Sequence, residues 1–321
     1  MNMNLRKSSL SLLLCVTAVL GGVLSATSQT IKTRVASTRL EPTSLAQWSR
    51  DLGYNGSDLC PMILGLTGCP FVNVDLSGVK IALMLDTGTA SGFVITTQAP
   101  SIPHRVGERH EELNADGSHR GESLGIRVDT ISVLGRVFKD VAGTLSDWRM
   151  YSSVPFNGTV GLDFFLDRRL TLDYRSRTVG VSAIPLPEKL DPKRYLCIDL
   201  VDAPESHGHI LYARAVVNKR KAIVYFDTGY SVSFIDPGFV EGIESIERPG
   251  RFKIFRNAVP VELGGQKLIL DELRESPVKR GPGFDLPVAL ALGSDFLSKF
   301  VVTIDVRAKK LILALAEPKL E

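Results

Sequence analysis

The chain has 321 residues, of which 44% are hydrophobic and 23% are charged, and its formal net charge at pH 7 is +3. This balance excludes a disordered chain, and the length corresponds to about two domains of roughly 150 residues each. Because the basic residues are not gathered into a stripe, no nucleic-acid partner is expected.

The N-terminus has the pattern of a secretion signal. Arg6 and Lys7 precede an apolar stretch from Leu10 to Leu24, and the small residue Ala26 follows it. The apolar stretch is shorter than the roughly 20 residues that cross a bilayer. We therefore predict a signal peptide over 1–26, an exported (periplasmic or secreted) protein, and no integral membrane domain beyond this segment. An uncleaved N-terminal membrane anchor is the alternative.

Residues 27–62 form a polar N-terminal extension or pro-segment, with a short helix expected around Leu45 to Leu52. Three cysteines follow the signal: Cys60, Cys69 and Cys197. In an exported protein the first two could form a disulfide, and three free thiols are the alternative. No Cys-x-x-Cys pair occurs, so neither redox nor zinc chemistry is expected.

From Pro70 onward, short apolar stretches alternate with turn residues, as is typical of antiparallel hairpins. Turns are expected at 77–78, 134–135 and 175–177. This pattern predicts a first β-lobe over 63–184. Prolines and charges then indicate a linker over 185–197. The hairpin pattern begins again after the linker and predicts a second β-lobe over 198–321. Its turns are expected at 218–219 and 264–265.

The tripeptide Asp-Thr-Gly occurs once in each half, at 86–88 and at 227–229. Each copy follows an apolar run that predicts a buried strand, and its glycine indicates a turn. Two such turns that met face to face would bring the carboxyl groups of Asp86 and Asp227 together.

A second block is also repeated. Residues 161–175 recur 132 residues further along the chain, as 293–307. The shared residues are Gly161, Asp163, Phe164, Thr171, Asp173 and Arg175, which match Gly293, Asp295, Phe296, Thr303, Asp305 and Arg307. Two shared blocks in the same order indicate an internal duplication. Each half is then one unit of short antiparallel strands, and the fold class is all-β.

An apolar strand that enters Asp-Thr-Gly, followed downstream by a Gly-x-Asp-Phe block, resembles the aspartic peptidases. Each half is similar to a retropepsin-like unit, and their fusion resembles the bilobal, pepsin-like arrangement. The matching stretches, 71–181 and 210–313, cover most of the mature chain. The resemblance implies the acid-protease fold: two similar lobes related by pseudo-two-fold symmetry, with the active-site cleft between them.

The resemblance also implies roles for single residues. Asp86 and Asp227 are the expected catalytic pair at the floor of the cleft. The threonines of the two turns would cross-link them, and the glycines would allow close approach and donate amides to the carboxylates. The supporting residues that the resemblance implies are Thr87, Gly88, Thr89, Thr228, Gly229, Gly161 and Gly293.

Two departures from the family pattern stand out. Family members usually carry Ser, Thr or Ala after Asp-Thr-Gly, where a hydroxyl can bond the outer carboxylate oxygen. Thr89 fits this pattern, whereas Tyr230 does not. Pepsin-like enzymes also usually have a tyrosine in the flap of the first lobe, and no tyrosine lies between Thr97 and Val141. The candidate flap, around 114–123, is polar and resembles the shorter retropepsin type.

Two carboxylates held within a few ångström share a proton, so one is a base while the other is an acid. The base can activate a water, and the acid can polarise a peptide carbonyl, without a metal, a cofactor or a covalent intermediate. We therefore predict an exported, monomeric aspartic endopeptidase, a hydrolase whose substrate is an extended peptide or protein segment.

Other interpretations remain open. The same bilobal fold could bind a peptide without cleaving it, an alternative that Tyr230 and the missing flap tyrosine favour. Each half could also pair with another chain, as retropepsin-like units do. Two further groups of residues have structural interpretations. Asp163, Asp173, Asp295 and Asp305 are expected to be turn or cap residues, and His104, His110 and His119 are expected to lie in a solvated loop rather than at a metal site.

Overall fold

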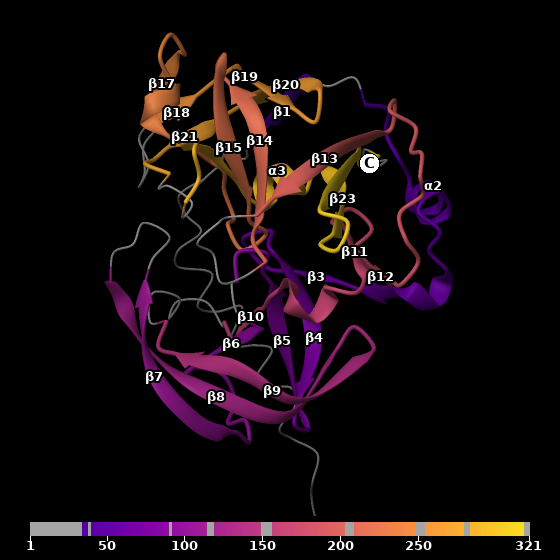
Figure 1. Cartoon of the computed structure of the whole chain (residues 1–321), viewed down its shortest axis with the longest axis vertical. Helices are drawn as coiled ribbons and strands as arrows, with labels where there is room; N and C mark the ends of the chain where they lie inside the picture. The colour runs from indigo at the N-terminus through magenta and orange to yellow at the C-terminus, as the bar shows by residue number, and fades with distance from the viewer. Residues whose placement is uncertain are drawn as a thin grey trace, which may run out of the picture. The chain divides into compact units, whose positions relative to one another are not determined.

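The computed structural model describes residues 34–37, 40–89, 92–113, 119–148, 156–202, 209–247, 254–278 and 283–317. Strands make up most of these residues and form two sheets, which confirms the all-β prediction (Figure 1). The predicted signal peptide lies outside the described residues, and so does the tip of the candidate flap at 114–118.

The smaller sheet has eight strands in the order β3-β4-β5-β10-β6-β9-β8-β7. The bounds are Ile63–Leu64 (β3), Pro70–Leu76 (β4), Val79–Leu85 (β5), Phe93–Thr96 (β6), Arg105–Leu113 (β7), His119–Val133 (β8), Arg136–Ser146 (β9) and Gly158–Val160 (β10). The long hairpin β7–β8 brings His110 and His119 into strands, so the expected solvated loop is wrong for these two histidines.

The larger sheet has sixteen strands, thirteen of them in the order β17-β18-β21-β16-β22-β15-β14-β13-β24-β23-β11-β12-β2, with β1, β19 and β20 attached at its side. The first eight in chain order are β1 (Arg34–Ser37), β2 (Leu59–Pro61), β11 (Arg169–Asp173), β12 (Thr178–Ser182), β13 (Tyr195–Val201), β14 (Leu211–Val217), β15 (Arg220–Phe226) and β16 (Phe234–Ile235). The rest are β17 (Ser245–Glu247), β18 (Ile254–Arg256), β19 (Val259–Leu263), β20 (Gln266–Asp271), β21 (Leu273–Glu275), β22 (Val288–Leu292), β23 (Phe300–Asp305) and β24 (Lys310–Leu315).

Helices are short. The α-helices are α2 (Leu45–Asp51) and α3 (Ser294–Leu297), and the 3₁₀ turns are η1 (Gly56–Asp58), η3 (Leu162–Phe165) and η4 (Pro237–Phe239). Helix α2 confirms the helix predicted around Leu45, and the Ser44 side chain caps it by accepting a hydrogen bond from the Gln47 amide. Within the described residues, no helix is long and apolar enough to cross a membrane.

The hairpin turns lie where the sequence predicts them. The four two-residue turns at 77–78, 134–135, 218–219 and 264–265 all have positive φ at both central residues. This is the type I′ geometry, whose twist matches that of the flanking strands. It is strained for Leu134 and Lys219, which have no favourable left-handed conformation. The turn sequence therefore fixes the register of each hairpin in both halves.

Strands β11 and β23 are counterparts in the duplicated blocks, and they pair with each other. Thr171 faces Thr303, which lies 132 residues further along, and their hydroxyl oxygens are 2.7 Å apart. On either side, Leu170 faces Ile304 and Leu172 faces Val302. Thr171 thus faces its own counterpart, and Leu170 and Leu172 each face the counterpart of the other, so a local two-fold relation centred on the Thr171–Thr303 pair holds between the two strands.

The expected domain boundaries differ from the observed strand pairing in two places. Strands β11 and β12 belong to the predicted first lobe, but they pair within the larger sheet, beside β23 and β2. In addition, β13 begins at Tyr195, so the predicted linker over 185–197 ends inside a strand. The cause is the duplication itself, because each half contributes its last hairpin to a shared set of strands.

The described part of the N-terminal extension is built into the larger sheet. Strand β1 pairs with β20, and β2 pairs with β12. Trp48 in α2 is fully buried against Tyr54, and its indole N–H donates to Asp173 over 2.9 Å. The Arg169 guanidinium is also buried and donates to the Leu52 carbonyl. This packing favours an integral segment over a detachable one.

Replacing Trp48 with Ala is expected to lower the free energy of unfolding by about 3–5 kcal/mol, the usual cost of removing a fully buried aromatic side chain. Urea denaturation followed by circular dichroism measures the loss. Leu45→Ala is the matched control, because Leu45 lies on the same helix with 36% of its surface exposed. Equal stability of the two variants would show that the extension is not part of the cooperative fold.

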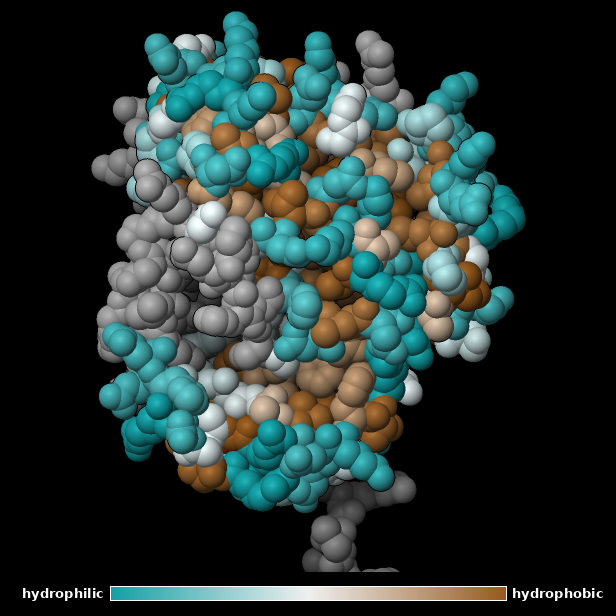
Figure 2. Space-filling view, viewed as in Figure 1, coloured by the Kyte–Doolittle hydropathy of each residue, from teal (hydrophilic) through white to brown (hydrophobic). Residues whose placement is uncertain are grey.

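The core lies between these strands. Apolar residues of both sheets form one large buried cluster. Strands β5 and β15, which end just before the two Asp-Thr-Gly tripeptides, both contribute to it. In β15, for example, Val224 and Phe226 are completely buried. On the face drawn in Figure 2, hydrophilic side chains occupy most of the rim and hydrophobic ones show between them near the middle. The buried strands therefore hold the two tripeptides at fixed positions.

Candidate functional site

Each Asp-Thr-Gly tripeptide follows the end of a buried strand that has a parallel neighbour. Strand β5 ends at Leu85 beside β10, and β15 ends at Phe226 beside β22. The Asp86 amide donates to the Val160 carbonyl, and the Asp227 amide donates to the Leu292 carbonyl, both over 3.0 Å. The apolar runs that precede the tripeptides thus form central strands, and these strands deliver both aspartates to turns of the same geometry.

The threonines of the two turns cross-link them reciprocally. The Thr87 amide donates to the Thr228 hydroxyl oxygen over 3.0 Å, and the Thr228 amide donates to the Thr87 hydroxyl oxygen over 3.1 Å. The Thr87 hydroxyl in turn donates to the Phe226 carbonyl, and the Thr228 hydroxyl donates to the Leu85 carbonyl. Both side chains are buried. Four buried hydrogen bonds therefore fix one turn against the other.

The two carboxyl groups lie on opposite turns. The Gly88 amide donates to Asp86 Oδ1 and the Gly229 amide donates to Asp227 Oδ1, both over 2.7 Å. A Cβ atom added to Gly88 would lie 2.3 Å from Asp227 Oδ2, and one added to Gly229 would lie 2.6 Å from Asp86 Oδ1. Each carboxyl group thus packs on the glycine of the other turn, so any side chain at either glycine would displace it.

Burial and the neighbouring charge act together on Asp227. Its side chain is only 5% exposed. Desolvation, the charge of Asp86 and a side-chain hydrogen bond with Asp86 raise the pKa of the Asp227 carboxyl well above its ordinary value. Asp86 is half-buried and therefore better solvated. Burial and the nearby Asp86 charge therefore both favour the protonated form of the Asp227 carboxyl.

The outer oxygens of the two carboxyl groups have different donors. The Thr89 hydroxyl lies 2.9 Å from Asp86 Oδ2, as the sequence predicts for a residue after the tripeptide. Tyr230 occupies the equivalent position in the second turn, but the donor to Asp227 Oδ2 is Tyr225, at 2.5 Å. Sequence reasoning missed Tyr225. The signal was available, because a residue two positions before an aspartate on a strand points to the same side as the aspartate.

Gly161 and Gly293 lie close to the residues that follow the two tripeptides. A Cβ atom on Gly161 would lie 2.7 Å from the Thr89 carbonyl oxygen, and one on Gly293 would lie 2.6 Å from the Tyr230 carbonyl oxygen. The four aspartates of the repeated block accept backbone hydrogen bonds, which confirms their structural interpretation. Asp163 accepts from Gly92, Asp173 from Arg175 and Ser176, Asp295 from Ser233, and Asp305 from Ala308.

The three described cysteines are free thiols, so the Cys60–Cys69 disulfide is not formed and the free-thiol alternative holds. Cys69 lies behind the second turn, with Sγ 3.6 Å from the Gly229 carbonyl oxygen. Burial raises the pKa of its thiol to about 11, so it stays protonated and unreactive at neutral pH. In the part of the chain that the structure describes, no three His, Cys, Asp or Glu side chains come together as metal ligands.

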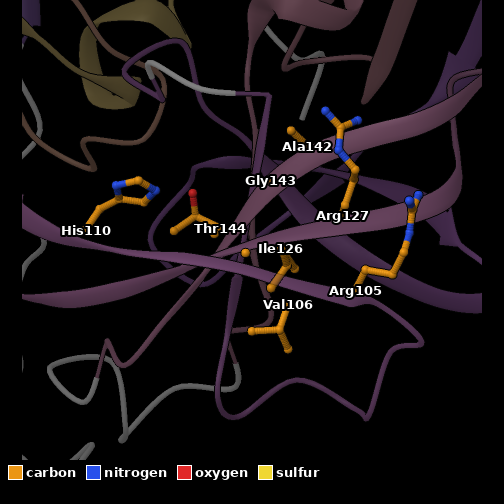
Figure 3. A pocket seen from close by; sticks show the side chains of 10 residues that line it. Arg105, Val106, His110, Ile126, Arg127, Ala142, Gly143 and Thr144 are labelled. Carbon is orange, nitrogen blue, oxygen red and sulfur yellow. The ribbon is translucent and has the colours of Figure 1, made fainter.

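A hollow of about 510 Å³ lies on the long hairpin β7–β8 and the neighbouring strand β9 (Figure 3). Arg105 and Arg127 lie at one end of it and His110 at the other. Both arginines bind the Asp140 carboxylate, which neutralises part of their charge. The residues that line this hollow include neither aspartate of the two turns. The hollow is therefore a feature of the hairpin and not of the site.

The raised pKa of Asp227 predicts a pH dependence of stability. From about pH 4, where an unfolded Asp loses its proton, up to the raised pKa, the folded chain keeps a proton that the unfolded chain has released. The free energy of unfolding therefore falls as the pH rises through this window. Asp227→Asn has no proton to lose, so its stability relative to the wild type should increase with pH.

Urea unfolding of both proteins between pH 4 and pH 8 measures this difference. Asp129→Asn is the control, because the Asp129 side chain is 82% exposed. The raised pKa would be refuted by stability curves of Asp227→Asn and wild type that run parallel over the whole range.

Neither the models of known protein families nor the curated proteins give a match to this chain. The interpretation of the site therefore rests on this chain's own residues and their geometry.

Proposed function

We propose that this protein is an aspartic endopeptidase that uses Asp86 and Asp227 as its catalytic pair. The observation that carries the proposal is the reciprocal bonding of Thr87 and Thr228, which fixes the two aspartates on facing turns. We also propose that the halves form two retropepsin-like lobes of the acid-protease fold, related by pseudo-two-fold symmetry, with the substrate cleft between them. The local two-fold relation of β11 and β23 supports this arrangement.

The mechanism follows from the unequal carboxyl groups. Asp227, whose pKa is raised by burial and by Asp86, holds the proton and acts as the acid. Asp86, the less buried of the two, acts as the base. It removes a proton from a water held between the two groups, and the water oxygen attacks the peptide carbonyl carbon. Asp227 gives its proton to the carbonyl oxygen, which yields a neutral gem-diol intermediate.

Breakdown of the intermediate reverses the roles. The C–N bond breaks as the proton that Asp86 received passes to the amine nitrogen, and one gem-diol hydroxyl returns its proton to Asp227. The products are a carboxylic acid and an amine, and both aspartates regain their starting states. An extended peptide suits this geometry, because an extended backbone can present one carbonyl to both carboxyl groups.

The predicted signal peptide supports export to the periplasm or the exterior, and an aspartate from each half in one chain supports a monomer. The alternative proposal is a binding protein of the same fold that holds a peptide without cutting it. Tyr230 favoured that alternative, because it cannot supply the hydroxyl that Thr89 supplies. The hydrogen bond from Tyr225 to Asp227 weakens the argument, because the outer oxygen has a donor after all.

Incubation of the full chain with reduced, carboxymethylated lysozyme between pH 3 and pH 8 tests the proposal, with cleavage products identified by mass spectrometry. The blank is the double variant Asp86→Asn/Asp227→Asn. We expect cleavage by the wild type only, and inhibition by a peptide that contains statine, whose hydroxyl occupies the position of the attacking water. Tight binding of the statine peptide without cleavage at any pH would support the binding protein instead.

A further inference from the structure

The two catalytic turns match in backbone but not in side chains. The Thr89 amide donates to the Asp86 carbonyl and the Tyr230 amide donates to the Asp227 carbonyl, both over 3.2 Å. Thr89 and Tyr230 are therefore equivalent positions. Thr89 supplies its hydroxyl to its own aspartate, at 2.9 Å from Asp86 Oδ2.

In the second half the hydroxyl comes from the strand before the turn. Tyr225 lies two residues before Asp227 in β15, so both side chains leave the strand on the same side. The phenol donates to Asp227 Oδ2 over 2.5 Å. Its counterpart in the first half, two residues before Asp86, is Met84, which has no hydroxyl. Each half thus supplies one hydroxyl to the Oδ2 atom of its own aspartate. In the first half the donor follows the aspartate in the sequence, and in the second half the donor precedes it.

The surroundings of Tyr225 fix its ring. It packs on Tyr212 with ring centroids 5.3 Å apart and against Tyr230 with centroids 6.0 Å apart. Its hydroxyl also touches the other turn, because a Cβ atom on Gly88 would lie 2.4 Å from it. Tyr230 therefore packs against the Tyr225 ring, and the Tyr225 hydroxyl takes the role that a serine or threonine at position 230 would have.

We propose that Tyr225 is the positioning residue for Asp227: its phenol takes over, from the strand before the turn, the role that Thr89 has for Asp86. This inference rests on the proposed peptidase function. The phenol suits the task, because burial and the neighbouring Asp227 carboxyl raise the pKa of Tyr225 well above its ordinary value. Tyr225 therefore remains a donor wherever the enzyme is folded, and it orients the carboxyl group that carries the shared proton.

Tyr225→Phe removes only the hydroxyl and keeps the packed ring. We expect kcat for peptide hydrolysis to fall about 10- to 100-fold, as is usual for a lost hydrogen bond to a charged group, with little change in KM. Tyr195→Phe is the matched control, because it also removes a phenol that donates to a carboxylate, that of Asp51 over 2.8 Å, and Tyr195 is not among the described contacts of the two turns. We expect it to behave like the wild type.

The pH profile separates positioning from packing. A donor stabilises the ionised carboxyl group, so its loss should raise the pKa of Asp227 further, and the alkaline limb of kcat should move to higher pH. The titratable groups that face Asp227 are Asp86, Tyr225, Tyr212, Cys69 and Tyr174. Tyr225, Tyr212, Cys69 and Tyr174 stay protonated over this range because burial raises the pKa of each, so none of these four groups moves the alkaline limb.

A transplanted hydroxyl gives the decisive test. Tyr225→Phe/Tyr230→Thr places a threonine where Thr89 stands in the first half, and we expect its kcat to lie at least about threefold above that of Tyr225→Phe. A Tyr225→Phe enzyme with wild-type kcat and pH profile would overturn the proposal, and so would a double variant no better than Tyr225→Phe.

A second readout needs no activity. In protein labelled with ¹³C at the aspartate carboxyl groups, the Asp227 signal, assigned with Asp227→Asn, should titrate at higher pH in Tyr225→Phe than in the wild type. An unchanged titration refutes the role of Tyr225 even if the wild type cleaves no peptide. Absence of wild-type cleavage refutes only the proposed function.

Discussion

Asp86→Asn and Asp227→Asn are each expected to lower kcat/KM for peptide hydrolysis by about 10³-fold or more. General acid–base catalysis by one side chain contributes roughly 10²- to 10⁴-fold, and in the proposed mechanism both groups act on the same water and carbonyl. Asn keeps the size of the side chain and can accept the hydrogen bond from Gly88 or Gly229, but it can neither take up nor release the proton. The fold should therefore persist while the chemistry stops.

Steady-state hydrolysis of a quenched fluorescent peptide measures the loss, and circular dichroism verifies the fold. Asp129→Asn is the matched control, because the same chemical change is made at a carboxylate that is 82% exposed. If either variant kept more than about a tenth of wild-type activity, that carboxyl group would not be a catalytic residue.

Thr228→Val is expected to affect stability and activity together. Valine has the shape of threonine without the hydroxyl, so the Thr87 amide loses its acceptor and the Leu85 carbonyl loses its donor in a buried site. Each buried polar group left unpaired costs about 1–3 kcal/mol, so the free energy of unfolding should fall by roughly 2–6 kcal/mol. The turns would also separate, and we expect kcat to fall at least about 100-fold with the loss of carboxyl alignment.

Urea denaturation and peptide hydrolysis measure the two losses. Thr228→Ser retains the hydroxyl and loses only a methyl group, so it should keep most of both properties. A Thr228→Val protein that is as stable and active as Thr228→Ser would mean that the cross-link between the turns has no functional role.

The local structure of the chain could be predicted because its signals are local. A two-residue turn such as 218–219 or 264–265 sets its own geometry and fixes the register of its hairpin. An apolar run before Asp-Thr-Gly is expected to be buried whatever the pairing of the other strands, and β5 and β15 are accordingly central strands. Because the tripeptide and the block after it are duplicated, a strand or turn predicted around them in one half is also predicted in the other.

Strand pairing between the halves could not be predicted. Strands β11 and β12 resemble any other hairpin in sequence, yet their outer partners are β23 and β2 instead of strands of the smaller sheet. The N-terminal extension looked detachable because it is polar on average, although Trp48, Leu52 and Tyr54 anchor it in the core. Such contacts join residues more than 100 positions apart, and no local pattern encodes them.

The two aspartates, the turns that carry them and the glycines that let the turns approach could be predicted from the sequence, because these depend on residue type and neighbouring residues. The donor to the second carboxyl group became visible in the folded chain. The outer oxygen of Asp86 is bonded by Thr89, whereas that of Asp227 is bonded by Tyr225. A carboxyl oxygen accepts a hydrogen bond from any donor at the right distance and angle, and that donor can precede or follow the aspartate in the sequence.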